Sequence, residues 1–103
     1  VTELKSNNIT VKLLENRVFK NEIELELTTA EYKLLCLLMK NKNIVLTRKN
    51  ILDKLWDGNG SFVDDNTLSV YVRRLRNKIE DNPENPKILL TVRRMGYKWN
   101  VIK

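Results

Sequence analysis

The side chains with the clearest chemical potential are basic ones that gather between residues 66 and 79. This stretch contains no Asp or Glu and holds Arg73, Arg74, Arg76 and Lys78. Residues 1–65 carry 10 basic and 10 acidic side chains, whereas residues 66–103 carry 9 basic and 3 acidic ones, so the net charge of +6 comes entirely from the last third of the chain. A positive field confined to one segment suits a polyanion, although a solvated basic helix face gives the same pattern.

A helix over about residues 65–80 would sort these side chains by face. At about 100° per residue, an apolar stripe faces a core and consists of Leu68, Val72, Leu75 and Ile79. The opposite side carries Asn66, Val70, Arg73, Arg74 and Asn77, and one flank adds Thr67, Tyr71 and Lys78. In a DNA major groove, Arg suits guanine, Asn suits adenine and a Val suits a thymine methyl group, while Thr, Tyr and Lys suit phosphate oxygens. The outward Val70 and the absence of acidic residues favour a DNA-reading helix over a helix face that is only solvated.

A second basic feature follows near the end of the chain. The strand-like runs Lys87–Val92 and Tyr97–Ile102 flank Arg93-Arg94-Met95-Gly96, which predicts a hairpin over about residues 87–102 with a basic tip. Thr91, Arg93 and Arg94 could follow a DNA backbone or reach into the minor groove, where Arg is favoured; the alternative is a solvated tip. We expect Gly96 to supply a positive φ at the turn. Tyr97 and Trp99 are expected to pack on the helices.

The remaining elements must support these two features. Apolar residues alternate over residues 9–27, which predicts a small antiparallel meander with Glu22, Glu24 and Glu26 facing outward. Thr28 and Glu31 fit a capping box at the start of an apolar helix that ends near residues 40–42 and buries Cys36. Residues 44–46 are expected to be extended. Thr47 is expected to cap a second helix from Arg48 to about Trp56, and Asp64 or Asp65 to cap the third.

Length and composition limit the function classes. The 103 residues correspond to one domain, and a hydrophobic fraction of 42% is that of a globular chain. There is no His and only one Cys, which excludes His-based acid–base chemistry, His metal sites and an internal disulfide. No phosphate-cradling glycine loop or nucleophile–base set is visible, so we expect no enzyme, no cofactor and no bound metal. With a single Cys, a reduced cytoplasmic setting is expected. Because the first residue is Val1 and not Met, we expect the chain to be a fragment or a processed product.

Four groups of residues together resemble a known family. They are Leu27-Thr28-x-x-Glu31-x-x-Leu34-Leu35, Leu46-Thr47-Arg48 with Leu55-Trp56, Thr67-Leu68-x-Val70-x-Val72-Arg73-Arg74-Leu75-Arg76-x-Lys78-Ile79-Glu80, and Thr91-Val92-Arg93-x-x-Gly96-Tyr97. In this order they resemble the C-terminal winged-helix DNA-binding effector domain of OmpR/PhoB-family two-component response regulators. The resemblance implies an α+β winged helix-turn-helix with an N-terminal antiparallel sheet, three helices and a C-terminal hairpin wing. It also implies that residues 1–103 form this single domain and that the receiver domain is absent from the chain.

The resemblance implies site residues and partners as well. Asn66, Val70, Arg73 and Arg74 match positions at base edges and adjacent backbone; Trp56, Thr67, Tyr71 and Lys78 match positions near phosphates; Thr91 and Arg93 match the wing, with Tyr97 as the wing aromatic. Arg94 stands where glycine is common, which implies a different tip shape or an added phosphate contact. Such domains bind promoter DNA as two head-to-tail copies, under control of a receiver phosphorylated by a sensor kinase. The loop 57–64 matches a segment that touches RNA polymerase.

Other functions stay open at this point. A winged-helix module could bind protein partners through the acidic strands or the loop. RNA binding is disfavoured because A-form grooves exclude a reading helix and the chain lacks an exposed aromatic platform. The sequence therefore predicts sequence-specific binding of promoter duplex DNA, with a protein-interaction module as the alternative.

Overall fold

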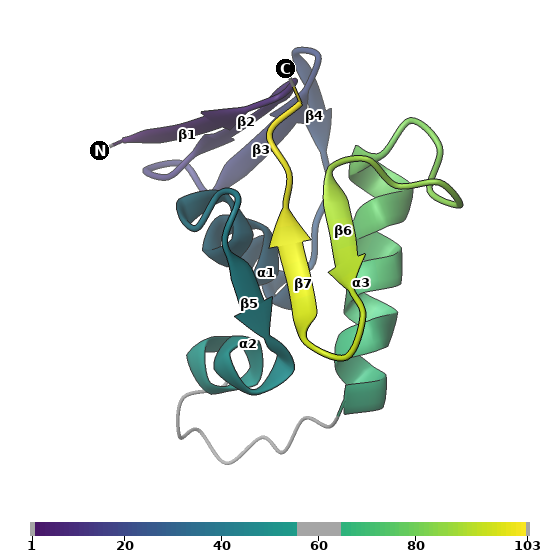
Figure 1. The fold of residues 1–103 in the computed structure, drawn as a ribbon. Helices are drawn as coiled ribbons and strands as arrows, with labels where there is room; N and C mark the ends of the chain where they lie inside the picture. Colours follow the sequence, from purple (N-terminus) through teal and green to yellow (C-terminus); the bar gives the residue numbers. More distant parts are fainter. Residues whose placement is uncertain (1, 56–64, 103) are drawn as a thin grey trace.

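The fold was obtained as a computed structural model, which describes residues 2–55 and 65–102 (Figure 1). The elements in this part of the chain are β1 Glu3–Ser6, β2 Ile9–Lys12, β3 Arg17–Lys20, β4 Ile23–Leu25, α1 Thr29–Lys40, β5 Val45–Thr47, α2 Arg48–Leu55, α3 Asp65–Ile79, β6 Leu89–Val92 and β7 Gly96–Trp99. The predicted α+β class, with an N-terminal sheet, helices and a C-terminal hairpin, is confirmed.

The N-terminal sheet is an antiparallel meander in the order β1-β2-β3-β4. Ile9, Val11 and Val18 are buried on its inner face, and the glutamates of the β4 region are exposed, as the alternation predicts. The alternation is wrong for Ile23, which is 70% exposed at the start of the edge strand β4. Strand β1 was not predicted, because its four residues include a single hydrophobic one, Leu4. Its inward position Ser6 is polar and accepts a 2.8 Å hydrogen bond from the indole Nε1 of Trp99, 93 residues away.

Both predicted helix caps of the first two helices are present. In α1, the hydroxyl of Thr28 accepts from Glu31 N at 3.2 Å and the Glu31 carboxylate accepts from Thr28 N at 3.0 Å, which completes a capping box. In α2, the hydroxyl of Thr47 accepts from Asn50 N at 3.1 Å. The predicted capping of α3 by Asp64 or Asp65 lies outside what the structure describes.

Helix α1 lies at the centre of the molecule and contacts α2, α3, β1 and β7. Its side chains Leu34, Leu35, Leu38 and Met39 are at most 1% exposed, and Cys36 is buried, as predicted. Helix α3 runs along one side of the molecule, beside β6 (Figure 1). Within the described residues, no helix has the length and apolar character needed to span a membrane.

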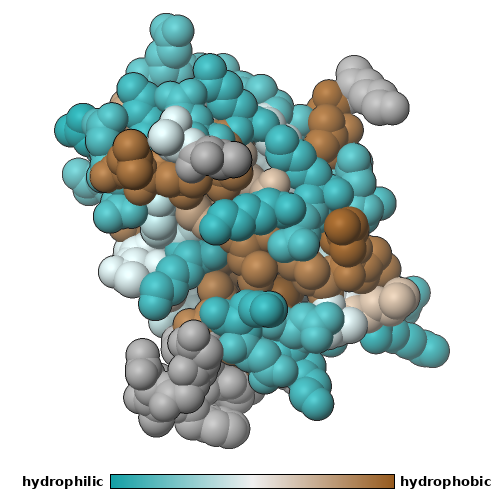
Figure 2. Space-filling model, turned by 90° about the vertical axis from the view of Figure 1, so that its left-hand side faces the viewer, coloured by the Kyte–Doolittle hydropathy of each residue, from teal (hydrophilic) through white to brown (hydrophobic). Residues whose placement is uncertain are grey.

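The surface is not uniformly polar. Figure 2 shows an apolar area among hydrophilic side chains on the left-hand side of the molecule as drawn in Figure 1. Large hydrophobic side chains that are exposed in the described part of the chain are Leu14, Ile23, Ile44, Val70, Met95 and Ile102. The exposure of Val70 therefore does not by itself distinguish α3 from the rest of the surface.

The C-terminal hairpin belongs to a three-stranded sheet in the order β5-β7-β6. The hairpin was predicted, but the pairing of β5 with β7 was not, and it explains Gly96. The prediction of a positive φ at Gly96 is wrong: Gly96 lies within β7 opposite Thr47, and Arg94 has the left-handed conformation, with φ 67°. A Cβ at position 96 would collide with the carbonyl oxygen of Leu46, so glycine is required for close strand approach.

Replacement of Gly96 by Ala should therefore open the β5–β7 pairing. We expect Gly96→Ala to lower the free energy of unfolding by about 2–3 kcal/mol, since the methyl group meets backbone that cannot move aside. Urea unfolding followed by circular dichroism measures the change. The matched control is Met95→Ala at the neighbouring exposed position, which should change stability by less than about 0.5 kcal/mol. Equal stability of Gly96→Ala and the parent would contradict this account.

Candidate nucleic-acid interface

Helix α3 has one buried and one exposed side, as its periodicity predicts. Leu68, Val72, Leu75 and Ile79 are 0–1% exposed and pack into the core. On the opposite side, Val70 is 37% exposed, and the other exposed residues there are Arg73, Arg74 and Asn77. The described salt bridges do not involve either arginine. This outer side therefore combines positive charge, an amide and an apolar group.

The other predicted interface residues differ in their surroundings. Thr67 and Tyr71 are half-buried, and Tyr71 packs against the hydrophobic core. Thr91, Arg93 and Arg94 are exposed in and beside the β6–β7 turn. Trp56, the loop 57–64 and the side chain of Asn66 lie outside the described part of the chain. Tyr97 and Trp99 are 5% and 0% exposed, which confirms that both pack inside.

Lys78 is bound within the protein. Its Nζ donates to the Glu31 carboxylate at 2.8 Å and to the carbonyl oxygen of Glu26 at 2.6 Å. The carboxylate of Glu31 belongs to a side chain that is only 1% exposed. The sequence predicted a phosphate contact for Lys78 and a capping box for Glu31. It did not predict the contact between them, because the two residues are 47 positions apart. The predicted phosphate contact stays a prediction; the structure adds a role in joining α3 to the start of α1.

The electrostatics of Glu31 follow from this contact. Burial by itself would raise the pKa of the Glu31 carboxyl, but hydrogen bonds from Lys78 and Thr28, together with the charge of Lys78, outweigh it and lower the pKa. The carboxylate is therefore charged at neutral pH, and it stabilises the fold in that form.

Arg76 joins α3 to the wing. Its Nε donates to the carbonyl oxygen of Leu89 at 2.9 Å, and its Nη2 donates to the hydroxyl of Thr91 at 2.7 Å. Burial lowers the pKa of the guanidinium, an effect that Tyr97 and Glu80 oppose. Sequence reasoning counted Arg76 only as part of the positive field.

Glu80 makes a second connection between α3 and the wing. Its buried carboxylate accepts backbone N–H groups of Lys87, Ile88 and Leu89 at 2.7–3.2 Å. Sequence reasoning missed this role. A weak signal was available, because an acid at the C-terminal end of a helix interacts unfavourably with the helix dipole and therefore gains from a compensating contact.

These contacts fix the direction of the wing. Glu80 binds residues 87–89, and Arg76, four residues earlier on the helix, binds residues 89 and 91. The contacts move toward the N-terminus of α3 as β6 moves forward along the chain, so the two elements are antiparallel. Four helical residues rise about 6 Å and two strand residues about 6.6 Å, so the contacts advance by similar distances along α3 and β6. Extending this register places Arg93 level with about Val72. The basic tip therefore lies beside the N-terminal half of α3, as Figure 1 also shows.

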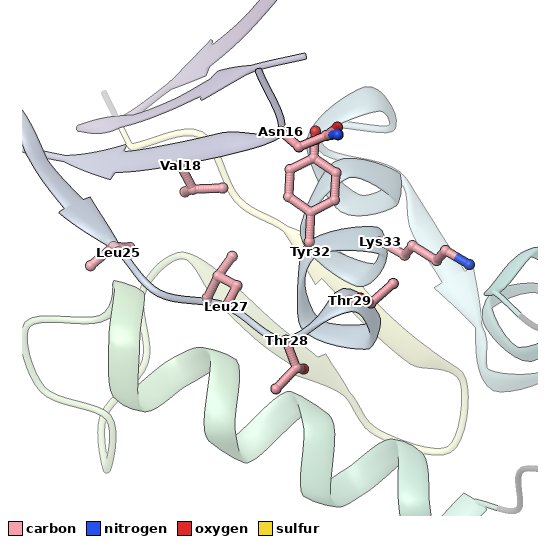
Figure 3. A pocket seen from close by; sticks show the side chains of 8 residues that line it. All are labelled: Asn16, Val18, Leu25, Leu27, Thr28, Thr29, Tyr32 and Lys33. Carbon is pink, nitrogen blue, oxygen red and sulfur yellow. The ribbon is translucent and has the colours of Figure 1, made fainter. Parts of the chain in front are cut away.

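A cavity of about 360 Å³ lies away from these residues, between the N-terminal sheet and α1 (Figure 3). The lining residues are Asn16, Val18, Leu25, Leu27, Thr28, Thr29, Tyr32 and Lys33. Burial and the neighbouring Cys36 raise the pKa of Tyr32 to about 12, so its phenol is neutral at physiological pH. None of the predicted interface residues lines this cavity. The described residues contain no group of three or more His, Cys, Asp or Glu side chains that could hold a metal ion.

An N-terminal antiparallel sheet, helices α1 to α3 and a basic hairpin tied to the last helix define a winged helix-turn-helix domain. A family model described as "Transcriptional regulatory protein, C terminal" matches residues 21–99. The chain belongs to this family, which is not a class of enzymes. It is similar to the C-terminal domains of response regulators.

Individual relatives agree with this assignment. SphR of Synechococcus elongatus, an alkaline phosphatase synthesis transcriptional regulatory protein, is 44% identical over 84 residues, which is 82% of this chain and 32% of that protein. The response regulator ArlR of Staphylococcus aureus is 44% identical over 91 residues, 88% of this chain and 41% of ArlR. The chain thus spans 32% and 41% of the lengths of these two curated relatives.

Solved structures share the fold. The C-terminal domain of the nisin resistance regulator NsrR, a lantibiotic response regulator, superposes with a TM-score of 0.76 at 35% identity, over 94% of this chain and 95% of that one. The DNA-binding domain of Klebsiella pneumoniae RstA, solved in complex with the RstA box, gives a TM-score of 0.83 at 24% identity over 97% and 98% of the two chains. At that identity, the RstA structure supports the fold alone.

The Glu31–Lys78 pair predicts how stability depends on pH. Because the pKa of Glu31 is lowered in the folded state, its contribution is present above the ordinary glutamate pKa of about 4.3 and is lost as the pH falls through the folded value. We expect Glu31→Gln to cost about 1–3 kcal/mol at pH 7, with a difference from the parent that shrinks toward acid. Urea unfolding between about pH 7 and pH 3 measures it.

The control for this series is Glu22→Gln, which changes an exposed carboxylate in the β3–β4 turn. It should leave both the stability at pH 7 and its decline toward acid close to those of the parent. A constant difference between parent and Glu31→Gln across the range would contradict the proposed coupling to Lys78.

Proposed function

We propose that this chain binds promoter duplex DNA sequence-specifically, with α3 in the major groove and the wing at the adjacent minor groove or backbone. The observation that carries the proposal is the outer side of α3, where Arg73 and Arg74 are exposed next to Asn77 and Val70 in a segment without acids. The width of the major groove admits a helix, and a face of this kind offers partners for base edges.

Each exposed side chain has a distinct target in this proposal. Arg73 and Arg74 can donate in pairs to guanine O6 and N7, Asn77 can bind adenine, and Val70 can contact a thymine methyl group. Asn66 belongs to the same base-reading set by its position on the helix. These contacts would give the sequence preference, because phosphate contacts carry no sequence information directly.

The backbone contacts come from the flanks and the wing. They involve Trp56, Thr67, Tyr71, Thr91, Arg93 and Arg94. The hydroxyl of Thr91 accepts from Arg76 and keeps its own proton, so it can still donate to a phosphate oxygen. Lys78 enters this proposal as a support of α3, since Glu31 and the Glu26 carbonyl already bind its ammonium.

Arg74→Ala should separate base reading from general electrostatics. We expect a loss of about 1–3 kcal/mol, or about 5- to 150-fold in affinity, on a preferred duplex, together with a relaxed preference at one base position. Fluorescence anisotropy with preferred and scrambled duplexes at several salt concentrations measures both. For the parent, the affinity should fall steeply with salt, because bound phosphates release counterions.

Lys5→Ala is the matched control. It removes one positive charge from β1, where Lys5 is exposed and pairs with Glu3 at 3.6 Å. Loss of this charge should leave the base preference unchanged. If Arg74→Ala and Lys5→Ala had equal, small effects on every duplex, α3 would not be the reading element.

The binding site itself can be found by selecting bound duplexes from a random pool and then footprinting. Enrichment of a motif whose halves repeat about one helical turn apart would support paired, head-to-tail binding. Selection of single-stranded RNA in preference to duplex DNA, or a salt-insensitive protein partner with no shift of any duplex, would favour the other function classes.

The proposal extends to the full-length protein. A receiver domain phosphorylated by a sensor kinase would promote pairing of two copies on direct repeats, in the cytoplasm. A contact with RNA polymerase through residues 57–64 is part of the same proposal. Its support is family membership together with the length of the relatives, which exceeds that of this chain.

A further inference from the structure

The outer edge of the wing is held by side chains rather than by a strand. Strand β6 pairs with β7 on one side, and the described residues supply no strand on its other side. There, Leu89 is bound at both backbone groups: its N–H donates to Glu80 at 2.7 Å and its carbonyl accepts from Arg76 at 2.9 Å. Arg76 and Glu80 therefore occupy the place of an edge-strand partner.

The spacing of these two residues explains how they act together. Residues four apart lie on the same face of a helix, so Arg76 and Glu80 both point toward β6. One supplies donors and the other acceptors, which is what the N–H and C=O groups of an open strand edge require. The second donor of Arg76 reaches the Thr91 hydroxyl at 2.7 Å, one step closer to the wing tip.

The chemistry of this contact is specific to arginine. A guanidinium presents several N–H donors in a rigid plane, so it can hold a carbonyl and a hydroxyl at once in fixed directions. A lysine ammonium carries the same charge on a flexible stem without that fixed fork. Arg76 therefore restrains the position of β6 relative to α3 in a way that charge alone does not.

We propose that Arg76 is a positioning residue for DNA binding: it fixes the angle between the wing and α3, so that Arg93 and Arg94 reach the same duplex as Arg73 and Arg74. This inference rests on the proposed function. Arg76 differs from Arg73 and Arg74 because two of its N–H groups bind β6, and it acts on DNA through the wing.

The first test needs no DNA. Arg76→Lys keeps the positive charge but removes the rigid set of guanidinium N–H donors. We expect amide hydrogen exchange of Leu89–Val92 to become at least 5-fold faster in this variant, while exchange in α1 stays as in the parent. Unchanged exchange in β6 would contradict the proposal that Arg76 restrains this strand. If Arg76→Lys does not fold, Thr91→Val removes one acceptor without a change of charge and should also speed exchange in β6.

The second test measures coupling on DNA. We expect Arg76→Lys to weaken binding to a selected duplex about 10-fold in the parent, but less than 2-fold in a variant that already carries Arg93→Ala and Arg94→Ala, because the misplaced wing then has little to lose. Equal factors in the two backgrounds would overturn the positioning role and assign Arg76 to a direct phosphate contact. Arg73→Lys, on the outer side of α3, is the control and should give similar factors in both backgrounds.

The two tests separate the inference from the proposed function. If the parent binds no duplex, the proposed function fails, and the positioning role of Arg76 fails with it. The exchange experiment still shows in that case whether Arg76 restrains β6. If the parent binds DNA and the two backgrounds respond equally to Arg76→Lys, the inference alone fails.

Discussion

The burial of one side of α3 is the constraint on which the rest of the molecule depends. Leu68, Val72, Leu75 and Ile79 are removed from water by packing against α1 and the rest of the core, and this packing fixes the rotation of the helix about its own axis. A helix turned by 100° would place Arg73 or Arg74 toward the core, where an unpaired charge costs several kcal/mol. The direction of the exposed basic side chains is thus a consequence of apolar packing, which their own charges do not determine.

Polar contacts then divide the basic residues of α3 into two groups. Arg73 and Arg74 remain exposed, whereas Arg76 and Lys78 bind groups on β6 and at the start of α1. The charge counted along the helix therefore overstates the charge available to a ligand. The same contacts make the helix, the wing and the first turn of α1 one connected unit. Strand β7 extends that unit to the N-terminal sheet, where Trp99 donates to Ser6 and Ile102 N donates to Asn7.

Predictions from the sequence succeeded where local rules decide the outcome. The capping box of Thr28 and Glu31, the cap at Thr47, the meander and the apolar stripe of α3 all depend on residues within a few positions of one another. Predictions failed where distant segments meet. Strand β1 needed Trp99 to satisfy Ser6, and Gly96 was explained by a turn although its neighbour is β5. The pairing of Lys78 with Glu31 was missed because nothing nearby in the sequence indicates it, whereas the phosphate contact of Lys78 stays a prediction.

The sequence by itself determined which side chains of α3 are apolar and which are basic, because helical periodicity is a local property of the backbone. It also determined the family, through the spacing of residues along α1, α3 and the wing. Only the tertiary structure decided which basic side chains bind groups within the protein, which strand lies against Gly96 and where the wing tip lies beside α3. These outcomes depend on distances between groups 13 to 93 residues apart, such as Arg76 and Leu89 or Trp99 and Ser6, and chain packing alone sets such distances.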